Sequence, residues 1–407
     1  MVEVEHTHGR DYERPRYELA EVFRRYLPEY RRRHKLSSHE ESVLEAIQKC
    51  RTAELGVHHE EVCDHCHYVV PAYNSCRNRN CPKCQGGERY KWVQARIGEL
   101  LPIPYYHVVL TLPHLLNALA LYNKAVIYDI FFKAAAATLL AFGWDARHLG
   151  AELGLIGILH TWGQNLSYHI HVHFIVTGGG LTSTGEWKML PYREKFLFPV
   201  KAVSKVVCGK FLDLLDEAYQ AGQLRFPDEL SSLSHPVAFE HYKSEVSAQE
   251  WYCYSKKPFS GAREVVEYIG RYTHRVAISN HRLLTIEGGQ IVFSYKDYQD
   301  GGKIKEMSLS SDQFIQRFLW HIVPRRFRKI RHSGFLHNPQ RQQKLSQARS
   351  QLEAMGRRLS EAVSSQREWD QTIAGESGRK CPQCQIGTLV VREVEPWRRL
   401  RKRMDSS

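Results

Sequence analysis

Histidines alternate with apolar residues between Tyr168 and Phe174, and this pattern predicts a β-strand with two different faces. Side chains two residues apart point to the same side of a strand, so the histidines share one face and the apolar residues share the other. The histidines are His169, His171 and His173. We expect the apolar face to pack in a core and the histidine face to bind a metal ion. An exposed polar face would give the same alternation.

Further segments rich in β-branched and aromatic residues predict strands at 106–113, 154–161, 283–286 and 291–295. The residues Trp162–Asn165 have the chemistry of a turn. We therefore expect 154–161 and 168–177 to form a hairpin that carries the histidines.

Helical patterns occupy much of the remaining chain. They predict two helices within 11–50, one from about 114 to 148, one at 200–221 and one at 262–272. A capping box is expected at Ser38 and Glu41, before the second helix. The most apolar stretch, Ala125–Trp144, contains Asp129 and Lys133, so it predicts a core helix and no membrane contact.

These elements predict an α+β fold in which a central antiparallel sheet is flanked by helices. The expected divisions are a helical and zinc-binding domain at 1–95, a catalytic domain at 100–310, and a basic, mostly helical region at 311–407 with a CxxC pair near its end.

The charge of the chain indicates its partner. It has 57 Lys and Arg against 44 Asp and Glu, a formal net charge of +13, which favours a polyanion such as DNA. The N-terminus lacks the basic start and apolar segment of a signal peptide, so we expect a cytoplasmic protein whose ten cysteines bind metal or stay reduced.

The cysteines of the N-terminal segment predict structural zinc. Two CxxC pairs stand at a spacing close to that of a four-cysteine zinc site: Cys63, Cys66, Cys81 and Cys84. Four thiolates complete a tetrahedron, so this zinc would fold the segment and take no part in catalysis. Spare donors leave open a second zinc, held by Cys50, His58 and Cys76. A further pair, Cys381 and Cys384, has no obvious second pair in the sequence.

Two tyrosines, Tyr268 and Tyr272, stand four residues apart in the predicted helix at 262–272, so both phenols leave the same helical face. One substrate could meet both hydroxyl groups. Two aromatic core residues would have the same spacing, and only the histidine strand favours the chemical interpretation.

Basic residues near the cysteines and in the C-terminal region are expected to contact DNA phosphates. They are Arg77, Arg79, Arg325, Arg326, Arg328 and Lys329. The cations at 325–329 surround Phe327, a pattern suited to a single strand held by phosphate contacts and base stacking. An exposed helix with one buried Phe would look the same.

The ordered motifs resemble the His-hydrophobe-His (HUH) endonucleases. The similarity is closer still to bacterial insertion-sequence transposases that move single strands by rolling circle and carry an N-terminal zinc-binding domain. It is carried by Tyr73–Gln85, His107–His114, His160–Gln164, His171–His173 and Tyr268–Ile278.

This resemblance implies a catalytic sheet of the HUH type, with Mg²⁺ or Mn²⁺ bound by His171 and His173. It also implies that Tyr268 and Tyr272 are nucleophiles that form 5′-phosphotyrosine links with the single-stranded ends of the protein's own mobile element. For the third metal ligand we expect His169 first, with Gln164 or a residue of the tyrosine helix as alternatives. No small-molecule substrate is expected, and the cellular site would be the bacterial nucleoid.

Other classes remain as alternatives. A plasmid replication initiator or a conjugative relaxase would use the same chemistry. A zinc-containing DNA-binding regulator would need no catalytic tyrosine. A zinc hydrolase is disfavoured because no Asp or Glu stands close to the histidine motif.

Overall fold

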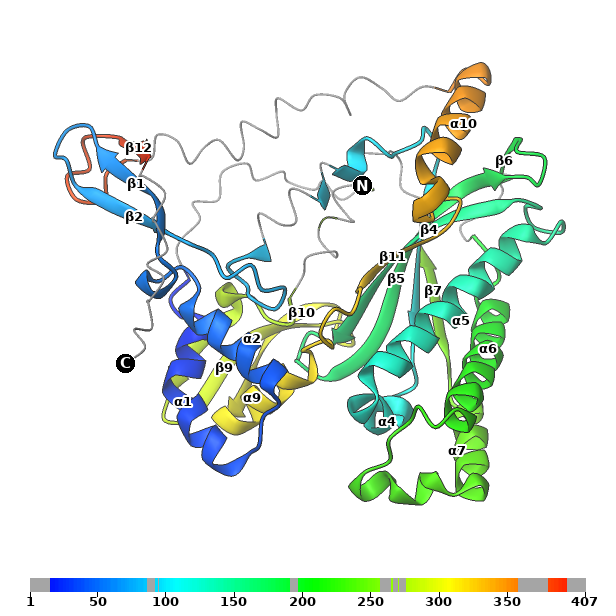
Figure 1. The fold of residues 1–407 in the computed structure, drawn as a ribbon, viewed down its shortest axis with the longest axis horizontal. Coiled ribbons are helices and arrows are strands. Elements are labelled where there is room, and N and C mark those ends of the chain that lie inside the picture. Colours follow the sequence, from blue (N-terminus) through cyan, green and yellow to red (C-terminus); the bar gives the residue numbers. More distant parts are fainter. Residues whose placement is uncertain are drawn as a thin grey trace, which may run out of the picture.

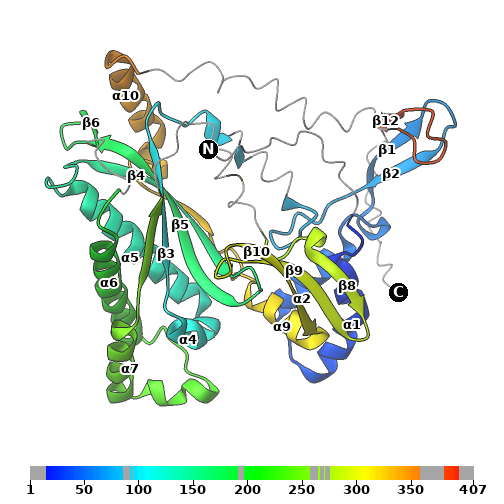
Figure 2. The same ribbon diagram turned by 180° about the vertical axis from the view of Figure 1, so that it is seen from behind.

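The computed structural model describes residues 15–85, 92–93, 95–190, 197–256, 265, 270, 276–357 and 380–393. Its α-helices, drawn in Figures 1 and 2, are α1 (Leu19–Arg33), α2 (Ser38–Lys49), α4 (Asn117–Tyr122), α5 (Lys124–Trp144), α6 (Val200–Gln220), α7 (Pro236–Ala248), α9 (Ser311–Trp320) and α10 (Arg341–Ala354). Its strands are β1 (Val57–Cys63), β2 (Val69–Tyr73), β3 (Tyr105–Thr111), β4 (Glu152–Trp162), β5 (Tyr168–Leu181), β6 (Trp187–Met189), β7 (Tyr252–Lys256), β8 (Leu283–Glu287), β9 (Gln290–Asp297), β10 (Lys303–Ser310), β11 (Ile330–Gly334) and β12 (Leu389–Glu393). The fold is α+β, as predicted.

A six-stranded sheet forms the centre of the larger part of the molecule. Five strands lie in the order β11-β4-β5-β3-β7, and the short β6 pairs with β5. Every neighbouring pair is antiparallel. The predicted hairpin is confirmed as β4 and β5, and it occupies the middle of the sheet.

Helices cover one face of this sheet. α5 and α6 lie side by side along it in both views (Figures 1 and 2). The apolar residues that alternate with the histidines, Ile170, Val172 and Phe174, are buried in this layer, as the alternation predicts. By length and hydropathy α5 could cross a membrane, but here its Tyr128 and Phe131 are fully buried in the same core.

The opposite face carries the histidines at one end and an apolar cluster at the other. This cluster joins Ile156 and Ile175 of the sheet to Leu345 of α10 and to Val265. Because His173 and Ile175 stand two residues apart on β5, they share this face. The predicted tyrosine helix lies outside the described residues except for Val265 and Gly270, both of which are helical.

A second core joins N-terminal residues of the chain to residues between 277 and 322. Helices α1, α2 and α9 pack on the three-stranded sheet β10-β9-β8. Leu19, Phe293 and Phe314 are all fully buried in it. This core therefore takes residues from all three of the segments that the sequence predicts as domains.

The cap of α2 is one residue earlier than predicted. The Ser37 side chain accepts from the Glu40 amide, and the Glu40 carboxylate accepts from the Ser37 amide at 2.9 Å. Two adjacent serines precede two adjacent glutamates, so the sequence is compatible with a capping box at either serine. The packing of α2 selects the one at Ser37 and Glu40.

A third, small sheet has the order β12-β1-β2 and stands at the edge of the molecule (Figure 1). β1 and β2 follow α2, whereas β12 comes from the C-terminal end of the described chain. Both pairings are antiparallel.

Candidate functional site

Three histidines meet where β4 and β5 lie side by side. The pairing places His160 opposite His171 and Ile158 opposite His173. One ring nitrogen from each of His160, His171 and His173 lies within 4.8 Å of the others. His160 and His173 are buried and His171 is half-buried, so the group sits at the floor of a recess. Three convergent imidazoles suit a single transition-metal ion.

The hairpin turn sets this register. The Gly163 amide donates to the Ser167 carbonyl at 3.0 Å, and the Ser167 amide donates to Asn165 Oδ1 at 3.1 Å. At the tip, Leu166 has a φ of 59° and is fully buried in the second core. Arg317 donates to the Asn165 carbonyl at 3.1 Å, which fastens the tip to α9. The tip is thus held from outside the central sheet.

His169, the first choice for the third ligand, is not in the cluster. Its Nδ1 lies 3.1 Å from Nε2 of His114 instead. Burial, and secondly the charge of His114, lower the pKa of His169. The pairing of β4 with β5 shifts register between His160 and Trp162, next to His169. Because of this shift, the regular alternation of side chains does not place His169 in the cluster. In the structure the cross-strand neighbour His160, and not His169, lies with His171 and His173.

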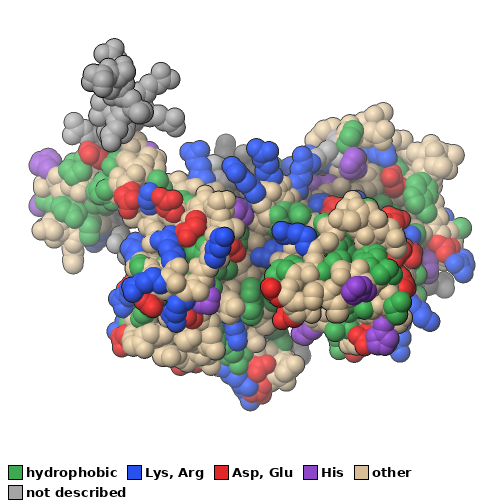
Figure 3. Space-filling model, turned by 60° about the horizontal axis from the view of Figure 1, so that its bottom comes forward, with side chains coloured by type: hydrophobic (Ala, Val, Ile, Leu, Met, Phe, Trp, Pro, Cys, Tyr) green, Lys and Arg blue, Asp and Glu red, His purple; other side chains and the backbone are tan. Residues whose placement is uncertain are grey.

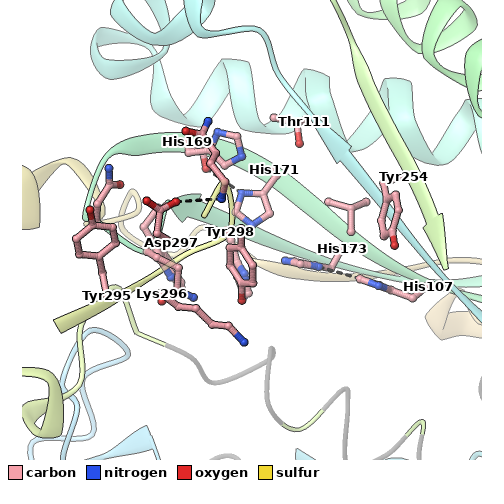
Figure 4. A pocket seen from close by; sticks show the side chains of 17 residues that line it. His107, Thr111, His169, His171, His173, Tyr254, Tyr295, Lys296, Asp297 and Tyr298 are labelled. Carbon is pink, nitrogen blue, oxygen red and sulfur yellow. Dashed lines mark hydrogen bonds between the residues drawn. The ribbon is translucent and has the colours of Figure 1, made fainter. Parts of the chain in front are cut away.

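Hydrogen bonds orient two of the clustered rings. His171 Nδ1 lies 2.9 Å from the His169 carbonyl, which can only accept, so this nitrogen carries the proton and Nε2 is the basic one. His173 Nδ1 lies 2.9 Å from Nε2 of the buried His107, and Figure 4 shows this contact as a dashed line. Contacts of this kind are typical of imidazoles that bind metals.

A recess of about 690 Å³ opens over the histidines. The sheet forms its floor, with His107 and Thr111 of β3 and Tyr254 of β7 beside the cluster (Figure 4). The end of β9 and the turn after it form a wall that includes Asp297 and Tyr298. A hydrogen bond from Lys305 to Asp297, 2.9 Å long, keeps the pKa of this carboxyl below its usual range.

The first cysteine cluster consists of Cys50, Cys76, Cys81 and Cys84. Its sulfur atoms are 3.5 Å apart between Cys50 and Cys84 and 3.6 Å apart between Cys76 and Cys84. Cys50 follows the last turn of α2, and Cys76 follows β2. A tetrahedral zinc with Zn–S bonds of about 2.3 Å would hold its sulfurs about 3.8 Å apart. These thiols therefore fit one structural zinc.

The second cluster consists of Cys63, Cys66, Cys381 and Cys384. The structure thus separates the two CxxC pairs that their spacing predicts as one site, and that grouping is wrong. Cys50 and Cys76, predicted to bind a second zinc with His58, complete the site of Cys81 and Cys84 instead. His58 lies on β1 and is in neither cluster. Spacing along the chain cannot reveal a partner pair from the opposite end.

The basic residues have different environments. Arg77, Arg325, Arg326 and Arg328 are exposed, whereas Lys329 is partly buried. Arg79 donates to the Phe327 carbonyl at 2.6 Å, which ties the cysteine segment to the loop after α9. Burial, and secondly the charge of Arg79, lower the pKa of Lys329 to about 8. Lys and Arg side chains gather along one edge of the molecule (Figure 3). That the six predicted basic residues contact DNA stays a prediction.

The chain matches known families in both of its halves. Residues 22–112 match the family described as "Transposase zinc-binding domain", and residues 154–344 match the family described as "Putative transposase". It is 44% identical to "Putative transposase y4qJ" of Sinorhizobium fredii, over 93% of this chain and 95% of that protein. It is 32% identical to the transposase for insertion sequence element IS801 of Pseudomonas savastanoi pv. phaseolicola, over 71% of this chain and 68% of that protein.

A solved structure of the conjugative relaxase TrwC in complex with OriT DNA is also similar. The identity is 13% and the TM-score 0.24, over 62% of this chain and 71% of that chain.

The class of protein is therefore a transposase with an N-terminal zinc-binding domain. The chain belongs to the IS91/IS801 family of insertion-sequence transposases, as the motifs of the sequence predict.

Proposed function

We propose that this transposase cleaves and rejoins single-stranded DNA at the ends of an insertion sequence, through 5′-phosphotyrosine intermediates, and so drives rolling-circle transposition. The observation that carries the proposal is the convergence of His160, His171 and His173 at the floor of a recess. Tyr268 and Tyr272 would be the nucleophiles. They lie outside the described residues, but Val265 of the same segment is buried on the histidine face of the sheet.

The histidines fit a divalent cation by their donor chemistry. Their ring nitrogens are close enough to share one ion, and hydrogen bonds orient His171 and His173. Imidazoles favour transition metals, whereas Mg²⁺ favours oxygen ligands. We therefore expect Mn²⁺ to bind more tightly than Mg²⁺. A bound ion would polarise the scissile phosphodiester and offset the charge on its oxygens.

The tyrosines would perform a balanced exchange of ester bonds. The phenol oxygen attacks the phosphorus, the bond to the 3′-oxygen breaks, and that oxygen leaves as a 3′-hydroxyl after taking a proton. The 5′-phosphate stays esterified to tyrosine and retains the energy of the cut bond. A 3′-hydroxyl then attacks the same phosphorus, and the phenol is released. Two tyrosines would let cleavage at one end alternate with strand transfer at the other.

The recess also offers surfaces for unpaired bases. Tyr254 is 56% exposed and Tyr298 is 69% exposed, and both line the recess. The Lys296 ammonium lies 5.5 Å from the centre of the Tyr298 ring. Exposed aromatic rings beside cations are the elements with which proteins hold a single strand.

The proposal is tested with labelled single-stranded DNA from the ends of the protein's own element, incubated with Mg²⁺ or Mn²⁺. We expect a protein–DNA adduct that survives denaturation. It should be lost in the double variant Tyr268→Phe, Tyr272→Phe. It should be retained in Tyr219→Phe, which removes a hydroxyl that donates a hydrogen bond to the Ser234 carbonyl and does not line the recess.

Binding without an adduct in either metal would contradict the proposal and favour the non-catalytic regulator. An adduct that persists in the double variant would assign the nucleophile to another residue.

A further inference from the structure

A second cluster of four cysteines joins the N-terminal region to the C-terminal end of the described chain. Cys63 and Cys66 belong to the end of β1 and the turn after it, and Cys381 and Cys384 precede β12. The sulfur atoms are 3.7 Å apart between Cys63 and Cys384 and 3.6 Å apart between Cys66 and Cys381. These separations agree with the edge of about 3.8 Å in a tetrahedral zinc thiolate. The C-terminal pair lies outside the range 22–112 that matches the zinc-binding family.

Each cysteine pair has the backbone of a metal-binding knuckle. The amides of His65 and Cys66 donate to Cys63 Sγ, both at 3.4 Å. In the same way, the Gln383 amide donates to Cys381 Sγ and the Gly387 amide to Cys384 Sγ, again at 3.4 Å. Donors aimed at sulfur stabilise the thiolate form, which is the form that binds zinc.

The two knuckles are fitted to each other beyond their sulfurs. Asp64 Oδ1 accepts from the Thr388 amide at 2.7 Å, and the Asp64 amide donates to the Thr388 carbonyl at 3.1 Å. A Cβ at Gly387 would lie 2.6 Å from both Cys63 Sγ and Asp64 Oδ1, so only glycine fits between the knuckles. β12 then pairs with β1 from Cys63–Leu389 to His59–Glu393.

The apolar core of this small sheet is very limited. Its buried cluster contains only Cys63, Cys381 and Leu389 among the described residues. A three-stranded sheet needs a larger apolar face, a covering element or a covalent or metal staple to be stable. The four thiolates are the feature that can supply this stability.

We propose that Cys63, Cys66, Cys381 and Cys384 bind a second structural zinc, a clasp that fastens residues 380–393 to the hairpin of β1 and β2. The clasp is separate from the site of Cys50, Cys76, Cys81 and Cys84, and it does not depend on the strand-cleavage chemistry. Without its metal, β12 would leave β1 while the first zinc and the central sheet remain.

Zinc content and hydrogen exchange of the full-length protein test this proposal together. Elemental mass spectrometry should find two zinc ions per chain in the wild type and one in the double variant Cys381→Ser, Cys384→Ser. Amides of β12 and of its partner β1 should lose protection in that variant, whereas those of α1 and α5 should not. Cys208→Ser, a buried cysteine of α6 in neither cluster, should keep both zinc ions and full protection.

Cys384→His supplies a further check, because imidazole can replace a thiolate at zinc, and it should retain both ions. One zinc ion per chain in the wild type would overturn the proposal. So would a serine variant that keeps two ions, or one that loses an ion while β12 stays protected.

Discussion

The histidine cluster and the cysteine clusters are both groups of metal-binding side chains, but the protein builds them in opposite ways. The histidines stand on neighbouring strands of a six-stranded sheet whose other face is buried under α5 and α6. The cysteines join short segments, and among the described residues the buried cluster of the sheet β12-β1-β2 consists of Cys63, Cys381 and Leu389. We therefore expect the fold to hold the histidines in place, and zinc to hold the cysteine segments in place.

The largest effect is expected at the first cysteine cluster. Cys81→Ser should release the zinc and unfold the segment around it, because binding to sites of this kind contributes about 10 kcal/mol or more of folding free energy. Hydrogen exchange should show loss of protection around Cys50 and Cys84, with the strands β4 and β5 still protected. If the central sheet unfolds as well, the contrast between the two kinds of site fails.

Removing a histidine of the cluster should have the opposite effect: adduct formation should slow, while stability should change little. His171→Ala should reduce the rate of adduct formation by at least about 100-fold, the upper end of what outer-shell changes produce. His171 is half-buried, so the free energy of unfolding should change by less than about 1 kcal/mol. Single-turnover adduct assays and urea unfolding measure the two effects. His169→Ala is the matched control, and an equal loss of rate there would restore His169 as a ligand.

The anchor of the hairpin tip should make stability depend on pH. His321 lies 3.3 Å from both the Thr161 hydroxyl and the Leu166 carbonyl, and burial lowers its pKa to about 3. In the unfolded chain its pKa would be about 6.5, so the unfolded state binds more protons below that pH. This contribution is present above pH 6.5 and is lost as the pH falls toward 3.

Urea unfolding should therefore become easier by about 2 kcal/mol between pH 7 and pH 5. His321→Gln should reduce this dependence but not abolish it, because burial also lowers the pKa of His332, to about 4. His241→Gln, at an exposed position of α7, should leave it unchanged. A wild-type stability that is constant between these pH values would show that the tip is held by other contacts.

The smallest effect is expected at His107, which orients His173 from β3. His107→Ala should weaken Mn²⁺ binding by about 10-fold, because outer-shell partners of metal-bound imidazoles contribute 10- to 100-fold. His107→Gln, which keeps a group able to accept the hydrogen bond, should recover part of this affinity. Titration calorimetry measures both variants, and unchanged affinity in His107→Ala would remove His107 from the metal site.

The sequence predicts the histidine site better than the cysteine sites, for a physical reason. Alternation within β5 is a local pattern, and it correctly places His171 and His173 opposite the buried Ile170 and Val172. The sequence does not predict that His160 joins this cluster, because its position depends on cross-strand register. Regular pairing counted back from the turn at 163–167 would place His160 opposite Ile170, and only the register shift between His160 and Trp162 brings it opposite His171.

The cysteine grouping depends on contacts that no local pattern contains. Cys63 and Cys384 are 321 residues apart, and their meeting follows from the pairing of β1 with β12. The spacing of the two N-terminal pairs is compatible with one zinc site, and only the three-dimensional arrangement rejects it. The second core also depends on contacts that no local pattern contains, because Leu19 and Phe314 belong to the same buried cluster.

Mass spectrometry of the covalent adduct can identify the nucleophile. The adduct formed with Mn²⁺ is digested with trypsin and nuclease, and the residue that carries the nucleotide is identified by fragmentation. We expect a 5′-nucleotide on Tyr268 or Tyr272. A nucleotide on any other residue, or a cleaved strand with no modified peptide, would contradict it.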